Sequence, residues 1–193
     1  MRRKIVLIIS SILILFLVIE CGNKMILKDV YVEVTDINDY DSVLGVTGTY
    51  KYHFGKYNDI FPEQIKNENN VEKFCYIYLN TFDPCYMGYL IMNYDEESFQ
   101  IEKDRLKNID SSENHYIYGA KGFLLDVLAV YANEYYGYIY ALADYEKSQI
   151  IYVELQFCNG IMDINYLDKI AQIHLPINFN THVEYEFMKR ENK

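Results

Sequence analysis

The sequence predicts an α+β domain built on a largely antiparallel sheet that includes a three-stranded meander, with helices mainly on one face and an N-terminal apolar helix before it. Three observations predict this class. Runs of apolar and aromatic residues of strand length are separated by short polar turns. Strand-like and helix-like segments do not alternate regularly along the chain, as a parallel sheet would require. A hydrophobic content of 51% and an aromatic content of 16% are sufficient for a packed core.

The first 24 residues are typical of an export signal, and residues 25–193 are expected to form one domain. Arg2, Arg3 and Lys4 precede an apolar run, residues 5–19. As a helix this run would span about 22 Å, which is shorter than the roughly 30 Å of the hydrocarbon core. We expect a signal anchor that passes once through the cell membrane at residues 5–19, with the basic end inside and the domain on the extracytoplasmic side.

Cys21 leaves alternatives to the anchor open. A cysteine directly after an apolar run that ends in a small residue resembles the lipidation site of bacterial lipoproteins, which would place a lipid on Cys21. Here Glu20 occupies the small-residue position, which disfavours cleavage and favours an uncleaved anchor. A lipoprotein and a secreted protein are the alternatives.

The domain is more acidic than the whole chain. The formal net charge is -10, but residues 1–24 contain four basic residues and one acidic residue, so residues 25–193 carry -13. Such a charge repels nucleic acid and favours a cationic partner. We therefore expect no nucleic-acid binding, and a basic protein or peptide is the expected class of partner.

The first elements of the domain are short. Residues 28–35 alternate as a strand does, and the segment that begins at residue 36 predicts a short helix that ends near Gly45 or Gly48. Asp36, Asp39 and Asp41 match no calcium-loop spacing, and we expect them to cap turns and bind no metal. Residues 61–65 predict one further helical turn.

Two aromatic runs, residues 71–80 and 86–94, lie on either side of a turn signal at Asp83-Pro84 and predict a hairpin. A hairpin centred there places Cys75 opposite residue 89 or 90. A disulfide between Cys75 and Cys85 is therefore not expected, and both thiols should be buried.

Residues 95–109 predict a helix, because acidic residues occupy its first turn and Lys107 its last. Glu102 and Arg105 break the apolar side of this helix, and they stand three residues apart, where an ion pair can form. Two interpretations stay open: a structural, half-buried ion pair, or a polar binding site reached from a cleft.

Residues 123–132, 136–144 and 149–157 predict the antiparallel meander. Tyr136, Tyr138 and Tyr140 alternate along its middle run and share one face. Hairpin loops of even length would place these tyrosines with Ile151 in the core. Loops of odd length would place them at a surface suited to a sugar or a peptide, so the three tyrosines are candidate binding residues.

The last segment predicts a second helix, residues 166–174, which Pro176 ends. Val183, Tyr185 and Phe187 alternate with polar residues and predict a final strand.

The sequence contains no phosphate-binding loop, dinucleotide-binding glycine pattern, metalloprotease motif or nucleophile elbow. It therefore assigns no catalytic residue, metal or cofactor, and it favours a non-enzymatic binding protein at the cell envelope. Two alternatives stay open. The first is an envelope hydrolase with an unmarked active site, for which Glu102, Arg105, His115 and the acidic clusters are the candidates. The second is a purely structural envelope protein.

Overall fold

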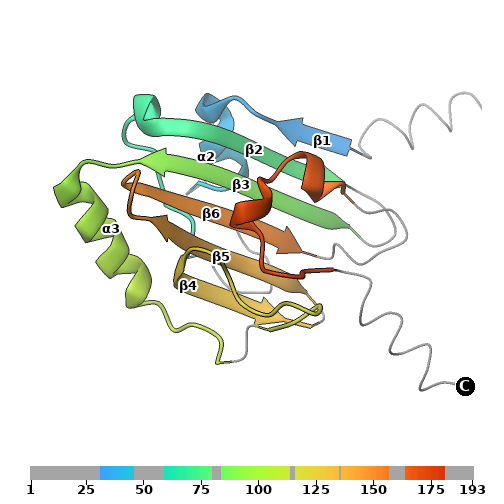
Figure 1. The fold of residues 1–193 in the computed structure, drawn as a ribbon. Coiled ribbons are helices and arrows are strands. Elements are labelled where there is room, and N and C mark those ends of the chain that lie inside the picture. Colours follow the sequence, from blue (N-terminus) through green and yellow to red (C-terminus); the bar gives the residue numbers. More distant parts are fainter. Residues whose placement is uncertain are drawn as a thin grey trace, which may run out of the picture.

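The computed structural model describes residues 31–45, 59–79, 84–113, 116–134, 136–156 and 164–180. Its strands form one antiparallel sheet in the order β1-β2-β3-β6-β5-β4 (Figure 1). The strands are β1 Tyr31–Val34, β2 Val71–Leu79, β3 Cys85–Asn93, β4 Asp126–Asn133, β5 Gly137–Asp144 and β6 Gln149–Gln156. The α-helices of this part of the chain are α2 Tyr40–Val43 and α3 Glu96–Lys107. The predicted antiparallel sheet is confirmed, whereas the N-terminal apolar helix lies outside the described residues.

The predicted hairpin and the predicted meander form the two halves of this sheet. Strands β2 and β3 form the hairpin, and β4, β5 and β6 form the meander. Strand β3 pairs with β6, so the two halves join at the centre. Cys75 lies opposite Tyr89, as predicted, and no bridge joins the two buried sulfur atoms of Cys75 and Cys85.

The meander resolves the question of loop length. Asp144 pairs with Gln149, so the loop between β5 and β6 is of even length. Tyr138 consequently lies opposite Leu155, and Tyr140 lies opposite Val153. The tyrosine face of β5 therefore belongs to the core, which is the first of the two predicted arrangements.

Two hydrophobic cores lie on opposite sides of the sheet. One contains Tyr138 and Tyr140 and is covered by residues 116–125 and 164–180. The other contains Ala141 and Ala143 and is covered by α2, α3 and residues 59–61. Figure 1 shows residues 164–180 (red) in front of the sheet and α2 behind it. We call these sides the loop-covered face and the helix-covered face.

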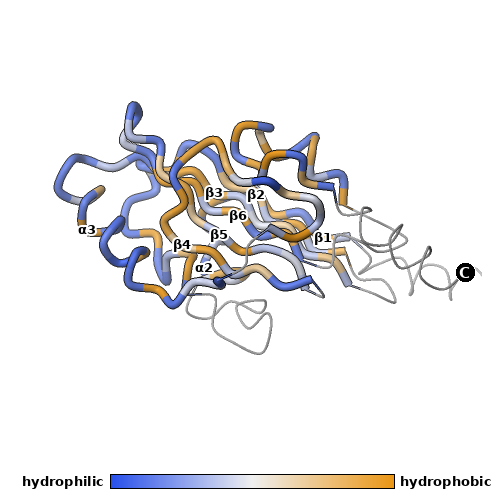
Figure 2. Tube along the Cα trace, turned by 60° about the horizontal axis from the view of Figure 1, so that its bottom comes forward, coloured by the Kyte–Doolittle hydropathy of each residue, from blue (hydrophilic) through white to orange (hydrophobic). Residues whose placement is uncertain are grey.

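Helix α3 forms where the sequence predicts it. The Asp95 side chain accepts a hydrogen bond from the Ser98 N–H and caps the helix, and Arg105 and Lys107 occupy its last turn. The buried side chains of α3 are Phe99 and Leu106, and they belong to the same core as Ala141 and Ala143 of β5. Figure 2 shows the largely hydrophilic α3 beside the hydrophobic central strands.

The remaining helical segments are shorter than expected. Residues 36–45 form a 3₁₀ turn, η1 Ile37–Asp39, followed by α2. The Asp36 side chain accepts a hydrogen bond from the Asn38 N–H, which confirms its capping role. A further 3₁₀ turn, η3 Glu68–Asn70, leads into β2. The predicted strand at residues 28–35 is β1, within the part of that range that the structure describes.

Two predicted helical segments are wrong. Residues 61–65 form no helical turn, because Phe61 is buried against the sheet and the Pro62 carbonyl accepts a hydrogen bond from Tyr40. Residues 166–174 form two 3₁₀ turns, η4 Tyr166–Asp168 and η5 Gln172–His174. The backbone of Ala171 between them is extended, and Ile170 and His174 on either side of it are both buried. The predicted final strand lies outside the described residues.

Candidate functional site

A groove on the helix-covered face brings α3 together with the segment that precedes β2. Its volume is about 700 Å³. Its walls come from three parts of the chain: residues 59–70, the end of β3 and the exposed side of α3. The lining residues are Asp59, Pro62, Glu63, Gln64, Lys66, Asn67, Asn70, Met92, Tyr94, Ser98, Ile101, Glu102 and Arg105.

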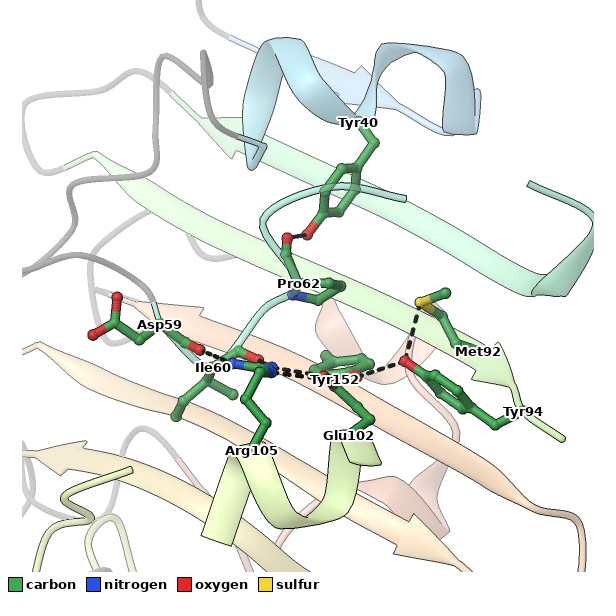
Figure 3. Close-up of polar contacts among 9 residues, drawn as sticks. All are labelled: Tyr40, Asp59, Ile60, Pro62, Met92, Tyr94, Glu102, Arg105 and Tyr152. Atoms are coloured by element: carbon green, nitrogen blue, oxygen red, sulfur yellow. Dashed lines mark hydrogen bonds and ion pairs between the residues drawn. The ribbon is translucent and has the colours of Figure 1, made fainter. Parts of the chain in front are cut away.

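The predicted ion pair between Glu102 and Arg105 is present at this groove. Arg105 Nε donates to Glu102 Oε2 at 2.8 Å, and one terminal nitrogen donates to Oε1 at 2.6 Å (Figure 3). The side chains are 38% and 15% exposed for Arg105 and Glu102, so the pair is half-buried. Burial by itself would lower the pKa of Arg105, but the Glu102 carboxylate outweighs it and the pKa is raised. The structural interpretation is therefore confirmed, since the two side chains form a half-buried ion pair, and this pair also lines the groove.

Arg105 also holds the wall of the groove in place. Its two terminal nitrogens donate to the backbone carbonyls of Asp59, at 2.5 Å, and of Ile60, at 2.8 Å (Figure 3). The Tyr40 hydroxyl donates to the Pro62 carbonyl from α2. Residues 59–62 are therefore fixed from both sides, and the side chains of Ile60 and Phe61 within this segment are buried. A guanidinium group with several fixed donors suits such a clamp.

Two tyrosines extend the network to the sheet. The Tyr152 hydroxyl donates to Glu102 Oε1 at 2.7 Å, and the Tyr94 and Tyr152 hydroxyls are 2.9 Å apart. The Tyr94 hydroxyl also lies 3.5 Å from the sulfur of Met92 (Figure 3). Burial raises the pKa of both tyrosines, that of Tyr152 strongly. Both hydroxyls therefore stay protonated and act as hydrogen-bond donors.

Sequence reasoning identified Glu102 and Arg105 but missed Tyr94 and Tyr152. One signal was present in the sequence. In an even-loop meander Tyr152 lies on the face opposite the core tyrosines, which is the face that a helix covers. The clamp on residues 59–62 left no such signal.

The chemistry of the groove favours binding over reaction. Arg105 uses four hydrogen bonds on Glu102 and two carbonyl groups, so its charge is neutralised within the protein. Asp59, Glu63 and Lys66 are the other charged residues of the lining, and three amide side chains and Ile101 also line the groove. Among the described residues, no group of His, Cys, Asp and Glu side chains could hold a metal ion.

The three candidate tyrosines do not form one surface. Tyr138 and Tyr140 are fully buried on the loop-covered face. The Tyr140 hydroxyl donates to the His174 carbonyl at 2.7 Å, and the Tyr138 hydroxyl bonds to the backbone of Ile117. Tyr136 is exposed and precedes β5. The other two candidates, Cys21 and His115, lie outside the described residues.

A smaller cavity of about 390 Å³ lies on the loop-covered face beside β1. Tyr31, Ile77, Leu79 and Ile164 are among its lining residues. Lys169, at its rim, donates to Glu33 at 2.6 Å. Most of the lining is apolar, so this cavity offers few groups for a polar ligand.

Comparisons with known proteins add no identity. No family model, no curated protein and no solved structure matches this chain. Within the described ranges, no helix is long and apolar enough to cross a membrane.

Proposed function

We propose that this chain is a membrane-held binding protein of the cell envelope, which takes a basic protein or peptide into the groove beside α3. Residues 5–19 hold it at the membrane, and the acidic domain 25–193 lies on the extracytoplasmic side. The function is recognition by a surface and needs no catalytic step.

One observation carries this proposal: carboxylates line the groove, while the hydrogen bonds of its arginine go to groups within the protein. Asp59, Glu63 and Glu102 outnumber Lys66 and Arg105 in the lining, and the bonds of Arg105 go to Glu102 and to backbone carbonyls, which leaves Asp59 and Glu63 as the carboxylates that face a ligand. A cationic side chain that enters the groove therefore meets carboxylate and amide oxygens. The domain charge of -13 steers cationic partners toward it from a distance.

The same geometry supports binding over the hydrolase alternative. Glu102 accepts bonds from Arg105 and Tyr152, so its oxygen atoms are already engaged. Tyr94 and Tyr152 have raised pKa values and cannot serve as bases near neutral pH. A fixed polar network of this kind preorganises a binding surface.

The binding proposal is tested on the full chain reconstituted in nanodiscs of zwitterionic lipid. The probes are a fluorescent lysine-rich peptide and a glutamate-rich peptide of the same length, followed by fluorescence anisotropy. We expect the lysine-rich peptide alone to bind, and its affinity to fall steeply between about 0.05 M and 0.3 M salt. Equal binding of both peptides, or binding insensitive to salt, would contradict the proposal.

A pair of variants locates the binding site. Asp59→Asn removes a charge from the groove, and Glu146→Gln removes one from the exposed loop between β5 and β6. We expect Asp59→Asn to lower the affinity for the lysine-rich peptide by about two- to fivefold, which is the range that one exposed charge pair contributes. Glu146→Gln should leave the affinity nearly unchanged. Equal losses in the two variants would assign binding to the general acidic field and not to the groove.

The mode of membrane attachment is tested separately with Cys21→Ser. An anchor formed by residues 5–19 predicts the same membrane fractionation for the variant and the natural sequence, because the apolar run is unchanged. Loss of the variant from the membrane fraction would instead support a lipoprotein.

A further inference from the structure

Residues 116–125 and 164–180 form the layer over the loop-covered face, and large apolar side chains of this layer are exposed to solvent. Leu124 is 65% exposed, Leu167 64%, Ile173 49% and Ile177 37%. They come from residues 116–125 and 164–180, the two segments that cover the same core. Several large apolar side chains exposed in the same two segments favour a surface that a membrane or a partner covers.

The two segments form one continuous layer. The Lys121 N–H donates to the Ile177 carbonyl at 2.9 Å, and the Ile177 N–H donates to the Gly122 carbonyl at 2.8 Å. The Asn180 N–H donates to the Tyr118 carbonyl at 2.9 Å. Inward residues of both segments, such as Ile117 and Leu175, enter the core. The apolar side chains on the outside therefore belong to a backbone that is fixed on the sheet.

This layer differs in charge from the rest of the domain. Lys121, Asp168 and Lys169 are the only charged residues of 116–125 and 164–180, so the layer has a slight positive balance. Residues 94–113, on the helix-covered face, hold seven acidic and three basic residues. An anionic or neutral bilayer repels the layer far less than it repels the side that carries α3.

The chain enters the domain next to this layer. Lys169 in the layer donates to Glu33 of β1 at 2.6 Å, and Tyr31 shares a cavity with Ile164 and Lys169. Only residues 20–30 separate the apolar run from β1. Eleven residues span at most about 40 Å, so the bilayer that holds residues 5–19 lies within reach of this side of the domain.

From these four observations we infer that the outer surface of residues 116–125 and 164–180 lies against the lipid bilayer. This inference rests on the proposed membrane attachment and adds the orientation of the domain to it. Leu124, Leu167, Ile173 and Ile177 enter the interface between headgroups and acyl chains, while Lys121 faces the headgroups. The groove beside α3 then opens away from the membrane.

Tryptophan fluorescence tests this orientation, because the sequence contains no tryptophan. Leu124→Trp and Leu167→Trp each place a single reporter on the layer. Ile101→Trp places one on α3 at a position of matched exposure, 64%. Each full-length variant is reconstituted in nanodiscs with and without lipids that carry bromine on the acyl carbons nearest the headgroup.

The expected result is that brominated lipid removes about half or more of the emission of Trp at positions 124 and 167, the effect of a depth of about 5–10 Å. Emission from position 101 should stay unchanged. No quenching at positions 124 and 167, or equal quenching at all three positions, would overturn the inference. A third outcome would also overturn the inference. If the emission of Trp at position 124 is blue-shifted and neither iodide nor brominated lipid quenches it, a protein and not the bilayer covers the layer.

Failure of the underlying membrane attachment looks different. In that case the full-length chain does not copurify with the nanodiscs at all, and none of the three reporters responds to bromine. Copurification without quenching at 124 and 167 would leave the attachment in place and reject the orientation alone.

Discussion

The two faces of the sheet are built from the same strands but differ in charge and in their polar contacts. The loop-covered face is sealed by segments with few charges, and its buried tyrosines bond to backbone atoms such as the His174 carbonyl. The helix-covered face carries an ion pair, tyrosines and a groove. Alternation along one strand separates these roles, since Tyr140 and Ala141 are neighbours in sequence and face opposite cores. The network of Glu102, Arg105 and two tyrosines and the groove that it lines therefore lie on one side of the sheet, and weakly charged segments close the other side.

The two hydrophobic cores should be equally well packed. Leu142 belongs to the loop-covered core and Leu90 to the helix-covered core, and both are fully buried. We expect Leu142→Ala and Leu90→Ala each to lower the free energy of unfolding by about 3 kcal/mol. Urea denaturation measures both. A loss below about 1 kcal/mol in either variant would show that its core is loosely packed.

The next largest effect should come from the clamp. Arg105→Met removes four hydrogen bonds and leaves Glu102 without its charged partner, so we expect a loss of about 2 kcal/mol. Hydrogen exchange in residues 59–62 should accelerate as well. Lys169→Met removes an ion pair on the other face whose carboxylate, Glu33, is more exposed than Glu102, and it should cost less than about 1 kcal/mol. Equal costs would remove the distinction between the two ion pairs.

A smaller difference should separate two buried tyrosines. Tyr152 donates to a carboxylate on the helix-covered face, and Tyr140 donates to a carbonyl on the other, each at 2.7 Å. Because hydrogen bonds to charged groups are stronger, we expect Tyr152→Phe to cost about 2 kcal/mol and Tyr140→Phe about 1 kcal/mol. The reverse order in thermal or urea denaturation would contradict the network described for the groove.

The smallest expected effect concerns pH and the loop-covered face. Burial and then Lys147 lower the pKa of His174, whose Nδ1 lies 2.7 Å from the Tyr89 hydroxyl. A lowered pKa means that the unfolded chain binds the proton more tightly. The contribution to stability is therefore present above the unfolded pKa of about 6.5 and is lost as the pH falls below it.

The check is denaturation of the natural sequence and of His174→Asn between about pH 7.5 and pH 5. The free energy of unfolding of the natural sequence should fall toward the lower pH, and the variant should show a flatter dependence. An unchanged slope in the variant would assign the pH dependence to other groups.

Local patterns were enough to predict much of this fold. Alternating aromatic runs identified the strands of the hairpin and the meander, and the acidic first turn with Asp95 identified α3. The spacing of Glu102 and Arg105 predicted their ion pair. Each of these signals acts within one element, so the sequence displays it directly.

The rest depends on contacts between distant residues. Arg105 reaches a carbonyl 46 positions away, and Tyr152 reaches Glu102 across 50 positions. No local pattern encodes such partners. Residues 166–174 have a helical composition, but the chain is extended at Ala171 between two 3₁₀ turns, and the Tyr140 hydroxyl bonds to the His174 carbonyl, so contacts with the sheet override the local preference.

Hydrogen exchange on the full chain in nanodiscs tests the division between the two faces most directly, because it reads both at once. Adding the lysine-rich peptide should slow exchange in residues 59–70 and 96–105 and leave residues 116–125 and 164–180 unchanged. Protection of 116–125 and 164–180 by the peptide would contradict this division between the faces. No protection of the groove segments at a concentration that saturates binding would contradict it as well.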